Sequence, residues 1–297
     1  MATTYQEQFS VDGIQFTTRE AVELIEIDNQ FAKATITTMG GSVLSFIPKG
    51  QKDLLWVSDS AIYDGSKPIR GGVPICWPWF GGAKQPGLPA HGFVRSMVWT
   101  VEKAAHLDTG ETRVLLACES NEKTLEQWPH VFKLKLCVEV GASLTLTLIS
   151  ANLSDESVDI TEALHTYFSV ANPIGMQIKG LEQSTHLDKL VDNAPAEIQT
   201  DVVVLNPPKD SVYLNQTGTV SIVDADNERQ IVIHKRNSQS SVVWNPGPEI
   251  VKGFADIDDQ AWLDFACVES GNVLEDFITL PAKAEHMLSV QYLVKPL

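Results

Sequence analysis

The segment FKLKLCVEVGASLTLTL, residues 132–148, decides the fold class of this chain. Apolar residues stand at 132, 134, 136, 138 and 140 and alternate with Lys133, Lys135, Cys137 and Glu139. Leucines then stand at 144, 146 and 148 and alternate with threonines. A period of two is typical of a strand with one buried face, and the Gly-Ala-Ser step between the runs suits a turn. The segment therefore predicts an antiparallel hairpin.

Strand patterns dominate the rest of the chain as well. Short apolar runs bounded by Gly, Pro and Asn predict further strands at residues 34–38, 113–118, 158–170, 230–234, 241–244 and 286–294. Helical patterns are few and short, at 121–128 (before Pro129) and at 259–265. Many strands with little helix indicate a mainly β fold, an antiparallel sandwich or barrel. Because no internal repeat or convincing linker interrupts the chain, we expect one domain over residues 1–297.

The bulk composition restricts the possible partners. The chain carries 38 acidic against 22 basic residues, a formal charge of −16, and 43% of its residues are hydrophobic, as in a protein with a substantial core. Such acidity argues against nucleic acid as a partner, although a local basic pocket could still hold a small anion. The N-terminus lacks a signal-peptide profile and no apolar run reaches membrane-span length, so we expect a cytoplasmic protein with no membrane partner.

The cysteines and the metal motifs carry little signal for chemistry. Cys76, Cys118, Cys137 and Cys267 form no Cys-x-x-Cys pair, and most stand among apolar residues, so buried free thiols are expected. No His-x-His or His-x-x-x-His spacing occurs, and the Gly pairs match neither the Walker nor the dinucleotide loop. We therefore expect neither a metal site nor a bound cofactor.

Residues 65–101 contain no Asp or Glu, although about five would be expected there by proportion. The same stretch carries Lys67, Arg70, Lys84, His91 and Arg95, and the whole chain has only six arginines. Positive charge gathered on an acidic protein marks a place where an anion could bind. The Gly, Pro and Trp residues around these cations favour shaped loops beside a groove.

Two further residues and one loop are candidates for a site, with alternatives open for each. In EALHTYFSV, a strand would place Ala163, His165, Tyr167 and Ser169 on one face, which suits either a satisfied core histidine or a site residue. Glu269 follows the apolar run 265–268, so it is either paired structurally or poised as a base with a pKa raised by burial. The WNPGP loop at 244–248 is either a packed turn or an aromatic surface for a sugar.

Six segments together carry a resemblance to a known family. They are IRGGVPICWPWFG at 69–81, GLPAHGFVR at 87–95, ALHTYF at 163–168, KDSVYLN at 209–215, VVWNPGP at 242–248 and FACVES at 265–270. In these segments the chain resembles the hexose-6-phosphate mutarotases of the aldose 1-epimerase superfamily. The resemblance implies a large antiparallel β-sandwich of the galactose-mutarotase type with few short helices, and a hexose 6-phosphate as substrate.

The resemblance also implies roles for particular residues. His165 would be the general acid and Glu269 the general base of anomer exchange at C1. The substrate-binding residues that it implies are Arg70, His91, Arg95 and Asp210. The working pair would be Glu⁻ and His⁺, so we expect the pKa of His165 to be raised by neighbouring negative charge from Asp210 or Glu269. The chain has no heptad pattern, so a monomer is the simpler expectation.

Two positions depart from the family pattern. Ser211 stands where close relatives often have Arg, and Ala90 stands where many members have Gln; both bear on substrate preference. Three other functions remain to be weighed. A non-catalytic sugar-phosphate sensor could lose His165 or Glu269, and a mutarotase for neutral aldoses would have no reason to keep both Arg70 and Arg95. A glycoside hydrolase would need two carboxylates flanking the bond.

Overall fold

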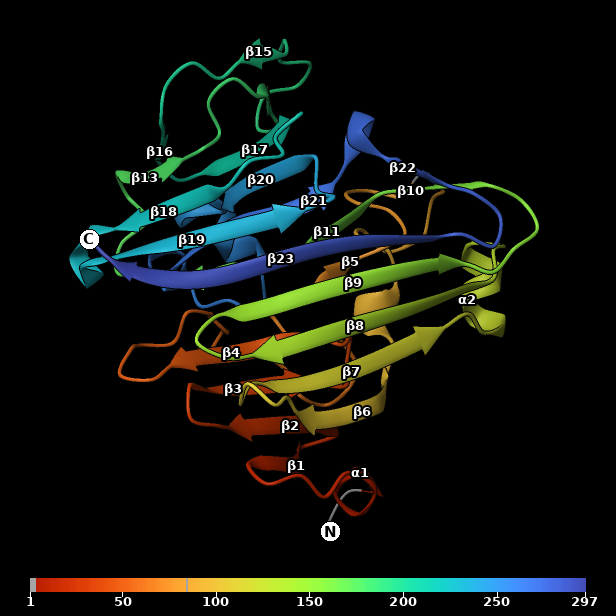
Figure 1. The fold of residues 1–297 in the computed structure, drawn as a ribbon. Coiled ribbons are helices and arrows are strands. Elements are labelled where there is room, and N and C mark those ends of the chain that lie inside the picture. Colours follow the sequence, from red (N-terminus) through yellow and green to blue (C-terminus); the bar gives the residue numbers. More distant parts are fainter. Residues whose placement is uncertain (1–3, 84) are drawn as a thin grey trace.

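The computed structural model describes residues 4–83 and 85–297. Lys84, one of the cations of the acid-free segment, lies outside the described residues. Among the helices that are described, none combines the length and the apolar character needed to cross a bilayer. Strands dominate the chain (Figure 1), as its period-two patterns predict.

The largest sheet has nine strands in the order β16-β13-β18-β19-β23-β9-β8-β7-β6. Neighbouring strands in it are antiparallel. Its strands are β6 (Thr100–His106), β7 (Thr112–Glu119), β8 (Phe132–Val140), β9 (Leu144–Asn152), β13 (Met176–Lys179), β16 (Val203–Leu205), β18 (Val220–Asp224), β19 (Arg229–Arg236) and β23 (Glu285–Pro296).

The opposite layer contains an eight-stranded sheet, in the order β15-β14-β17-β20-β21-β11-β5 with β12 paired to β21, and a four-stranded sheet, β1-β2-β3-β4. Strands β10 (Val158–Ile160) and β22 (Ile278–Leu280) form a separate pair. The eight strands are β5 (Ile75–Cys76), β11 (Glu162–Leu164), β12 (Tyr167–Ser169), β14 (Thr185–Asp188), β15 (Glu197–Ile198), β17 (Lys209–Leu214), β20 (Ser240–Asn245) and β21 (Phe265–Asn272). The four strands are β1 (Ile14–Arg19), β2 (Val22–Asp28), β3 (Ala32–Thr37) and β4 (Val43–Pro48).

The helices are short; α1 precedes the first strand, and the others lie at connections between strands. Helix α2 (Glu122–Gln127) confirms the helix predicted at 121–128: the Asn121 side chain accepts the Thr124 N–H, and the Thr124 hydroxyl accepts the Asn121 N–H. This reciprocal pair satisfies two N–H groups that the first helical turn leaves free. The other helices are α1 (Thr4–Gln8) and α3 (Gly247–Ile250), with 3₁₀ turns η1 (Val94–Ser96), η2 (Ala225–Asn227), η3 (Val251–Gly253), η4 (Ala261–Leu263) and η5 (Leu274–Asp276).

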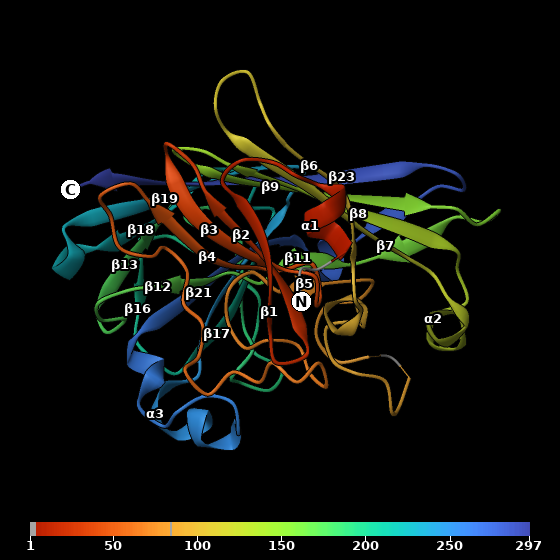
Figure 2. The same cartoon turned by 90° about the horizontal axis from the view of Figure 1, so that it is seen from below.

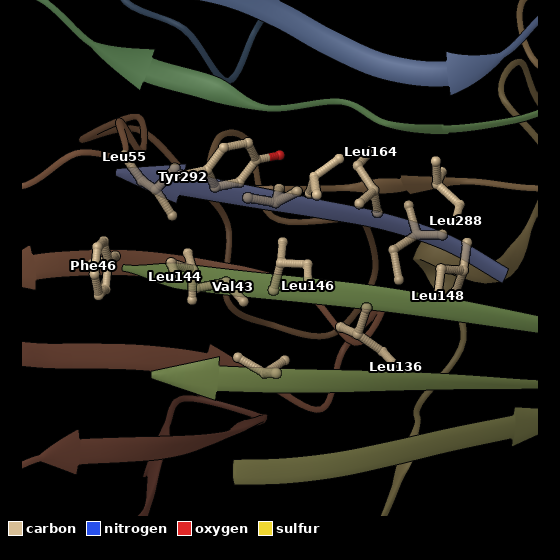
Figure 3. Packing of buried hydrophobic residues seen from close by; sticks show 14 of the residues in the cluster. Val43, Phe46, Leu55, Leu136, Leu144, Leu146, Leu148, Leu164, Leu288 and Tyr292 are labelled. Atoms are coloured by element: carbon tan, nitrogen blue, oxygen red, sulfur yellow. The ribbon is translucent and has the colours of Figure 1, made fainter. Parts of the chain in front are cut away.

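The predicted hairpin lies at the centre of the core. Strands β8 and β9 pair antiparallel, and their apolar positions are buried. Figure 3 shows their leucines packed with Leu288 and Tyr292 of β23 and with Phe46 and Leu164 of the opposite layer. Burying one such side chain contributes about 1.5 to 3 kcal/mol, so the single buried face of the hairpin holds the layers together. Figure 2 shows β9 and β23 on one side of the molecule and β11, β17 and β21 on the other. The sandwich prediction is confirmed.

Most strand predictions are confirmed to within one or two residues, in β3, β7, β19, β20 and β23. The continuous strand predicted at 158–170 is wrong, because the chain forms β10, β11 and β12 there. Two breaks interrupt it, at Thr161 and at His165–Thr166, and each has a bond to a distant segment: the Thr161 N–H donates to the Pro78 carbonyl and the His165 N–H to the Pro74 carbonyl. The Thr166 N–H closes a local turn on the Leu164 carbonyl. The helix predicted at 259–265 is reduced to η4.

All four cysteines are free thiols, with Cys137 half-buried and the others buried. That residues 1–297 form one domain stays a prediction.

Candidate active site

The outer face of the eight-stranded sheet forms the floor of the candidate site. Along β21, Phe265 and Cys267 belong to a cluster outside the sandwich, whereas Ala266 and Val268 belong to the core between the layers. Glu269 follows this alternation and therefore lies on the outer face. It pairs with Val242 of β20, which pairs with Val212 of β17. Figure 2 shows α3 on the side of β21 away from β23.

A second row on the same face brings in two more side chains. Asp210 pairs with Trp244, which pairs with Cys267. Because residues two apart on a strand share a face, Asp210 and Trp244 lie one row from Glu269. The burial of Asp210 raises the pKa of its carboxyl, with Lys189 opposing that shift.

His165 lies directly across from Glu269. Leu164 pairs with Ser270 and Tyr167 pairs with Cys267, so the register is the same on both sides of the break and places His165 opposite Glu269. His165 Nε2 is 3.2 Å from Glu269 Oε1. As predicted, Leu164 and Phe168 face the core, while Ala163 and Tyr167 share the other face with His165.

Arg70 is held beside this pair by three contacts. Its Nη1 donates to the Tyr167 hydroxyl at 3.2 Å, and the Tyr167 ring stacks on the His165 ring at 5.0 Å. Its Nε lies 3.2 Å from Asp256 Oδ2, an ion pair in which the N–H is not aligned for a hydrogen bond. The guanidinium also lies over the Phe254 ring, 5.1 Å from its centroid. These contacts fix the planar donor group of Arg70 next to His165.

Residues 85–95 bring His91 and Arg95 to the same place. The Gly81 N–H donates to His91 Nδ1 at 3.2 Å, so the neutral His91 ring carries its proton on Nε2. The His91 ring meets the His165 ring edge-on at 5.8 Å. Arg95 donates from Nη2 to the Ala90 carbonyl at 2.9 Å. Gly92 permits this turn because its φ is +71° and a Cβ there would lie 1.8 Å from the Trp77 carbonyl oxygen.

Two adjoining cavities cover these residues. The large chamber, about 570 Å³, is lined by all six residues that the sequence singles out: Arg70, His91, Arg95, His165, Asp210 and Glu269. The small chamber, about 350 Å³, adds Lys67 and Asp256. The side chains that line both are Arg70, Arg95, His165, Tyr167 and Phe254. Larger hollows of about 630 and 710 Å³ lie elsewhere, but the buried His–Glu pair makes the two chambers the candidate site.

The charges of the site act on the two facing groups in opposite directions. Burial lowers the pKa of His165 well below its ordinary value, and His91, Arg95 and Arg70 lower it further. Burial raises the pKa of Glu269 well above its ordinary value, and Asp210 raises it further against the opposing effect of Arg95. The prediction that the pKa of His165 is raised is therefore wrong for the protein by itself, because desolvation and the nearby cations lower it.

Both members of the pair keep unused hydrogen-bonding capacity. His165 Nδ1 and Glu269 Oε2 are buried and have no hydrogen-bond partner among the described residues. Buried polar atoms are usually satisfied, so exceptions beside a cavity indicate a site built for something other than stability. Within residues 4–83 and 85–297, no three His, Cys, Asp or Glu side chains are grouped as metal ligands would be.

The two departures from the family pattern fall in different places. Ser211 points to the opposite side of β17 from Asp210, where its hydroxyl lies 3.0 Å from His186 Nε2, and it lines neither chamber. Ala90 lines the large chamber.

Sequence reasoning assigned no role to Tyr167, Phe254 or Asp256. Tyr167 could have been found from its place on the His165 face, whereas Asp256 is one carboxylate among the 38 acidic residues and carries no local signal.

Comparison with known proteins gives consistent results. The family model described as "Aldose 1-epimerase" matches residues 23–293. A protein of Escherichia coli (strain K12) named "Putative glucose-6-phosphate 1-epimerase" is 34% identical over 90% of this chain and 89% of its own length. A protein of Cenchrus ciliaris with the same name is 33% identical over 83% of this chain and 77% of its own. A solved structure titled as a "putative mutarotase" from Salmonella typhimurium is 30% identical, covers 96% of this chain and 94% of its own, and has a TM-score of 0.89.

Proposed function

The chain belongs to the aldose 1-epimerase family, and we propose that it interconverts the α and β anomers of a hexose 6-phosphate, most simply glucose 6-phosphate. One observation carries the proposal: the facing pair of His165 and Glu269, 3.2 Å apart, borders the large chamber, whose other lining includes Arg70 and Arg95. The pair suits proton transfer, and the arginines suit a phosphate, which guanidinium groups can bind through two parallel hydrogen bonds.

The two chambers suggest how the substrate is oriented. The large chamber has a volume typical of a small-molecule site and takes the hexose ring. The 6-phosphate enters the small chamber, against Arg70 and Arg95. His165 lines both chambers, whereas Glu269 lines only the large one. The ring oxygen O5 is close to C6 along the sugar, so O5 meets His165 while the C1 hydroxyl meets Glu269.

In this orientation the two residues perform ring opening together. The Glu269 carboxylate removes the proton from the C1 hydroxyl, and the electron pair of that O–H bond forms the C1 carbonyl. The C1–O5 bond breaks, and O5 takes a proton from the His165 imidazolium. After rotation about the C1–C2 bond, His165 removes the O5 proton, O5 re-forms its bond to C1 on the other face of the carbonyl, and Glu269 returns its proton to the carbonyl oxygen. Groups held in place for both transfers typically accelerate such steps by about 10² to 10⁴, and the sequence of transfers uses no cofactor.

Two other residues would hold the ring during the exchange. Asp210 lines the large chamber and offers carboxylate oxygens to sugar hydroxyls. Trp244 lines the same chamber and meets the His165 ring edge-on at 6.0 Å. An indole face packs well against the C–H face of a sugar. Such contacts away from C1 place the anomeric centre between the two proton-transfer groups.

Anomer exchange measured by NMR tests the proposal. In this experiment the C1 signal of one anomer of glucose 6-phosphate is selectively inverted. The inversion should pass to the C1 signal of the other anomer much faster with the protein than without it. Absence of acceleration for any hexose 6-phosphate would reject the catalytic function and leave the sugar-phosphate sensor as the better explanation. Equal acceleration of glucose and glucose 6-phosphate would favour a mutarotase for neutral aldoses. Cytoplasmic location and a monomeric state stay predictions.

A further inference from the structure

The small chamber has a charge surplus of its own. Lys67, Arg70 and Arg95 line it against one carboxylate, Asp256, which leaves a formal surplus of two positive charges. Asp256 pairs with Arg70, and the lining of the small chamber has no other acidic residue. The two remaining positive charges are therefore left without a partner carboxylate in that lining. A tetrahedral dianion would match this surplus in charge, whether or not it is attached to a sugar.

The same cations lie next to the proton donor. Arg70 donates to the Tyr167 hydroxyl, and Tyr167 stacks on His165, so one aromatic ring separates the guanidinium from the imidazole. Arg70, Arg95 and His91 all oppose a positive charge on His165, and the pKa of His91 itself is lowered to about 4 by burial and by the two arginines. On the other side, Glu269 faces His165 directly, and Asp210 and the exposed Lys189 lie further along the large chamber.

These charges create a conflict within the proposed reaction. Ring opening needs His165 as the imidazolium and Glu269 as the carboxylate, but burial and the arginines favour the neutral form of His165. A dianion in the small chamber would offset the arginines next to His165 and leave Glu269, which lines only the large chamber, less affected. It would therefore favour the ion-paired state from which ring opening begins.

We propose that the small chamber is a separate oxyanion site, and that any tetrahedral dianion bound there activates the His165–Glu269 pair, so that the protein also exchanges the anomers of unphosphorylated hexoses when a free dianion is present. This inference rests on the proposed function. The dianion is neither consumed nor altered: Glu269 still takes the proton of the C1 hydroxyl, and O5 still takes the proton of His165. The phosphate of the natural substrate is then an activator carried by the sugar itself.

The test measures glucose anomer exchange by NMR with the full chain, with and without sodium sulfate, at an ionic strength held constant with sodium chloride. Sulfate is chosen because it is too weak a base to catalyse mutarotation appreciably by itself. We expect sulfate to accelerate protein-dependent glucose exchange by about tenfold or more, with saturation, as one unit of pKa change at His165 would allow. Over the same concentrations, sulfate should inhibit exchange of glucose 6-phosphate competitively.

The two arms separate the possible failures. Exchange of glucose 6-phosphate without sulfate tests the proposed function alone. If that exchange is fast and sulfate inhibits it competitively but leaves glucose exchange unchanged, the activation is wrong. If sulfate affects neither sugar, the small chamber is not a separate oxyanion site.

A variant and a spectroscopic signature complete the test. Arg70→Gln should lose the response to sulfate, whereas Arg236→Gln, which changes an exposed arginine of β19, should keep it. A full response in folded Arg70→Gln would overturn the proposal. In the wild-type chain labelled with ¹⁵N-histidine, sulfate should move the ring nitrogens of His165, assigned by their loss in His165→Asn, toward imidazolium shifts. Unchanged His165 shifts at saturating sulfate would also overturn it.

Discussion

The imidazole of His165, at the break between β11 and β12, faces the carboxyl group of Glu269 on β21, with Nε2 3.2 Å from Oε1. Neither residue is placed by a local motif. The register of β11 and β12 against β21 sets them opposite one another, and the His165 N–H donates to the Pro74 carbonyl at the break between these two strands. The sheet thus supplies a rigid mount for the pair, which is what proton transfer between fixed atoms requires.

Replacing the carboxylate tests its role in exchange. Glu269→Gln keeps the shape of the side chain and removes the base, so the rate of anomer exchange of glucose 6-phosphate should fall by about 10² or more, with the fold retained. The measurement is NMR exchange together with far-UV circular dichroism. Glu162→Gln is the matched control, because Glu162 is also buried and also pairs with a histidine, His286, at 2.9 Å, but lines neither chamber. Wild-type exchange in folded Glu269→Gln would refute the assignment.

Removing the imidazole should have a similarly large effect. His165→Asn retains a polar side chain but cannot donate and accept a proton at O5, so exchange should again fall by about 10² or more. His286→Asn removes the histidine of the other buried pair and should retain exchange per folded molecule. If His165→Asn exchanged anomers at the wild-type rate, the proton would have to reach O5 by another route.

The raised pKa of Glu269 also predicts how stability depends on pH. Because the folded chain holds the Glu269 proton to higher pH than the unfolded chain does, this group's contribution is most favourable below the ordinary value of 4.5 and is lost as pH rises toward the folded pKa. Glu269→Gln removes this loss. At a pH near 4.5, the melting temperature of Glu269→Gln should therefore match that of the wild type. Near pH 8 it should exceed that of the wild type by about 2 °C or more, measured by thermal unfolding. If the melting temperature of Glu269→Gln fell relative to that of the wild type as pH rose, the pKa of Glu269 would not be raised in the folded chain.

The fold could be predicted from the sequence where local patterns determine structure. The period of two at 132–148 was sufficient for the β8–β9 hairpin, because one face of that hairpin is buried throughout. Strand β12 was not separable from β11 in the sequence, since the break depends on Pro74, which is distant along the chain. The sequence interpretation also missed the helices α1 and α3 and the strands outside the predicted ranges, which are β1, β2, β4, β5, β6, β13, β14, β15, β16, β17, β18 and β22. Several of them, such as β5 and β15 with two residues each, are too short to show a period of two.

The candidate site was predictable mainly through motif resemblance, which named six residues that line one chamber. The charge pattern alone indicated only a pocket for an anion. Asp256 and Phe254 were missed because a carboxylate or ring in a loop carries no spacing signal, yet both hold Arg70. The direction of the pKa shift at His165 was wrong because burial, its largest cause, cannot be read from neighbouring residues in the sequence.

The arginines should discriminate between phosphorylated and neutral sugars. Arg70→Ala or Arg95→Ala removes charge-assisted hydrogen bonds worth about 1.5 to 3 kcal/mol each, so the affinity for glucose 6-phosphate should fall by about tenfold to a hundredfold. The affinity for glucose should change far less, because its C6 hydroxyl needs no cation. Titration of both ligands by NMR or calorimetry measures the difference, with Arg236→Ala as control. Equal losses for both sugars would count against a phosphate role.

The turn that carries His91 depends on a glycine next to it. A Cβ at Gly92 would lie 1.8 Å from the Trp77 carbonyl oxygen, and the φ of +71° is strained for any other residue. Gly92→Ala should therefore destabilise the chain by about 2 kcal/mol or more and displace His91 from the large chamber. Gly87→Ala is the matched control: Gly87 has a φ of +88° but nothing within 4 Å of its Cβ position, so it carries the backbone strain without the clash. Chemical unfolding and NMR exchange measure both variants. If Gly92→Ala and Gly87→Ala lost equal stability, backbone strain alone would account for the loss in both variants. The clash with the Trp77 carbonyl would then not be the reason that residue 92 must be glycine.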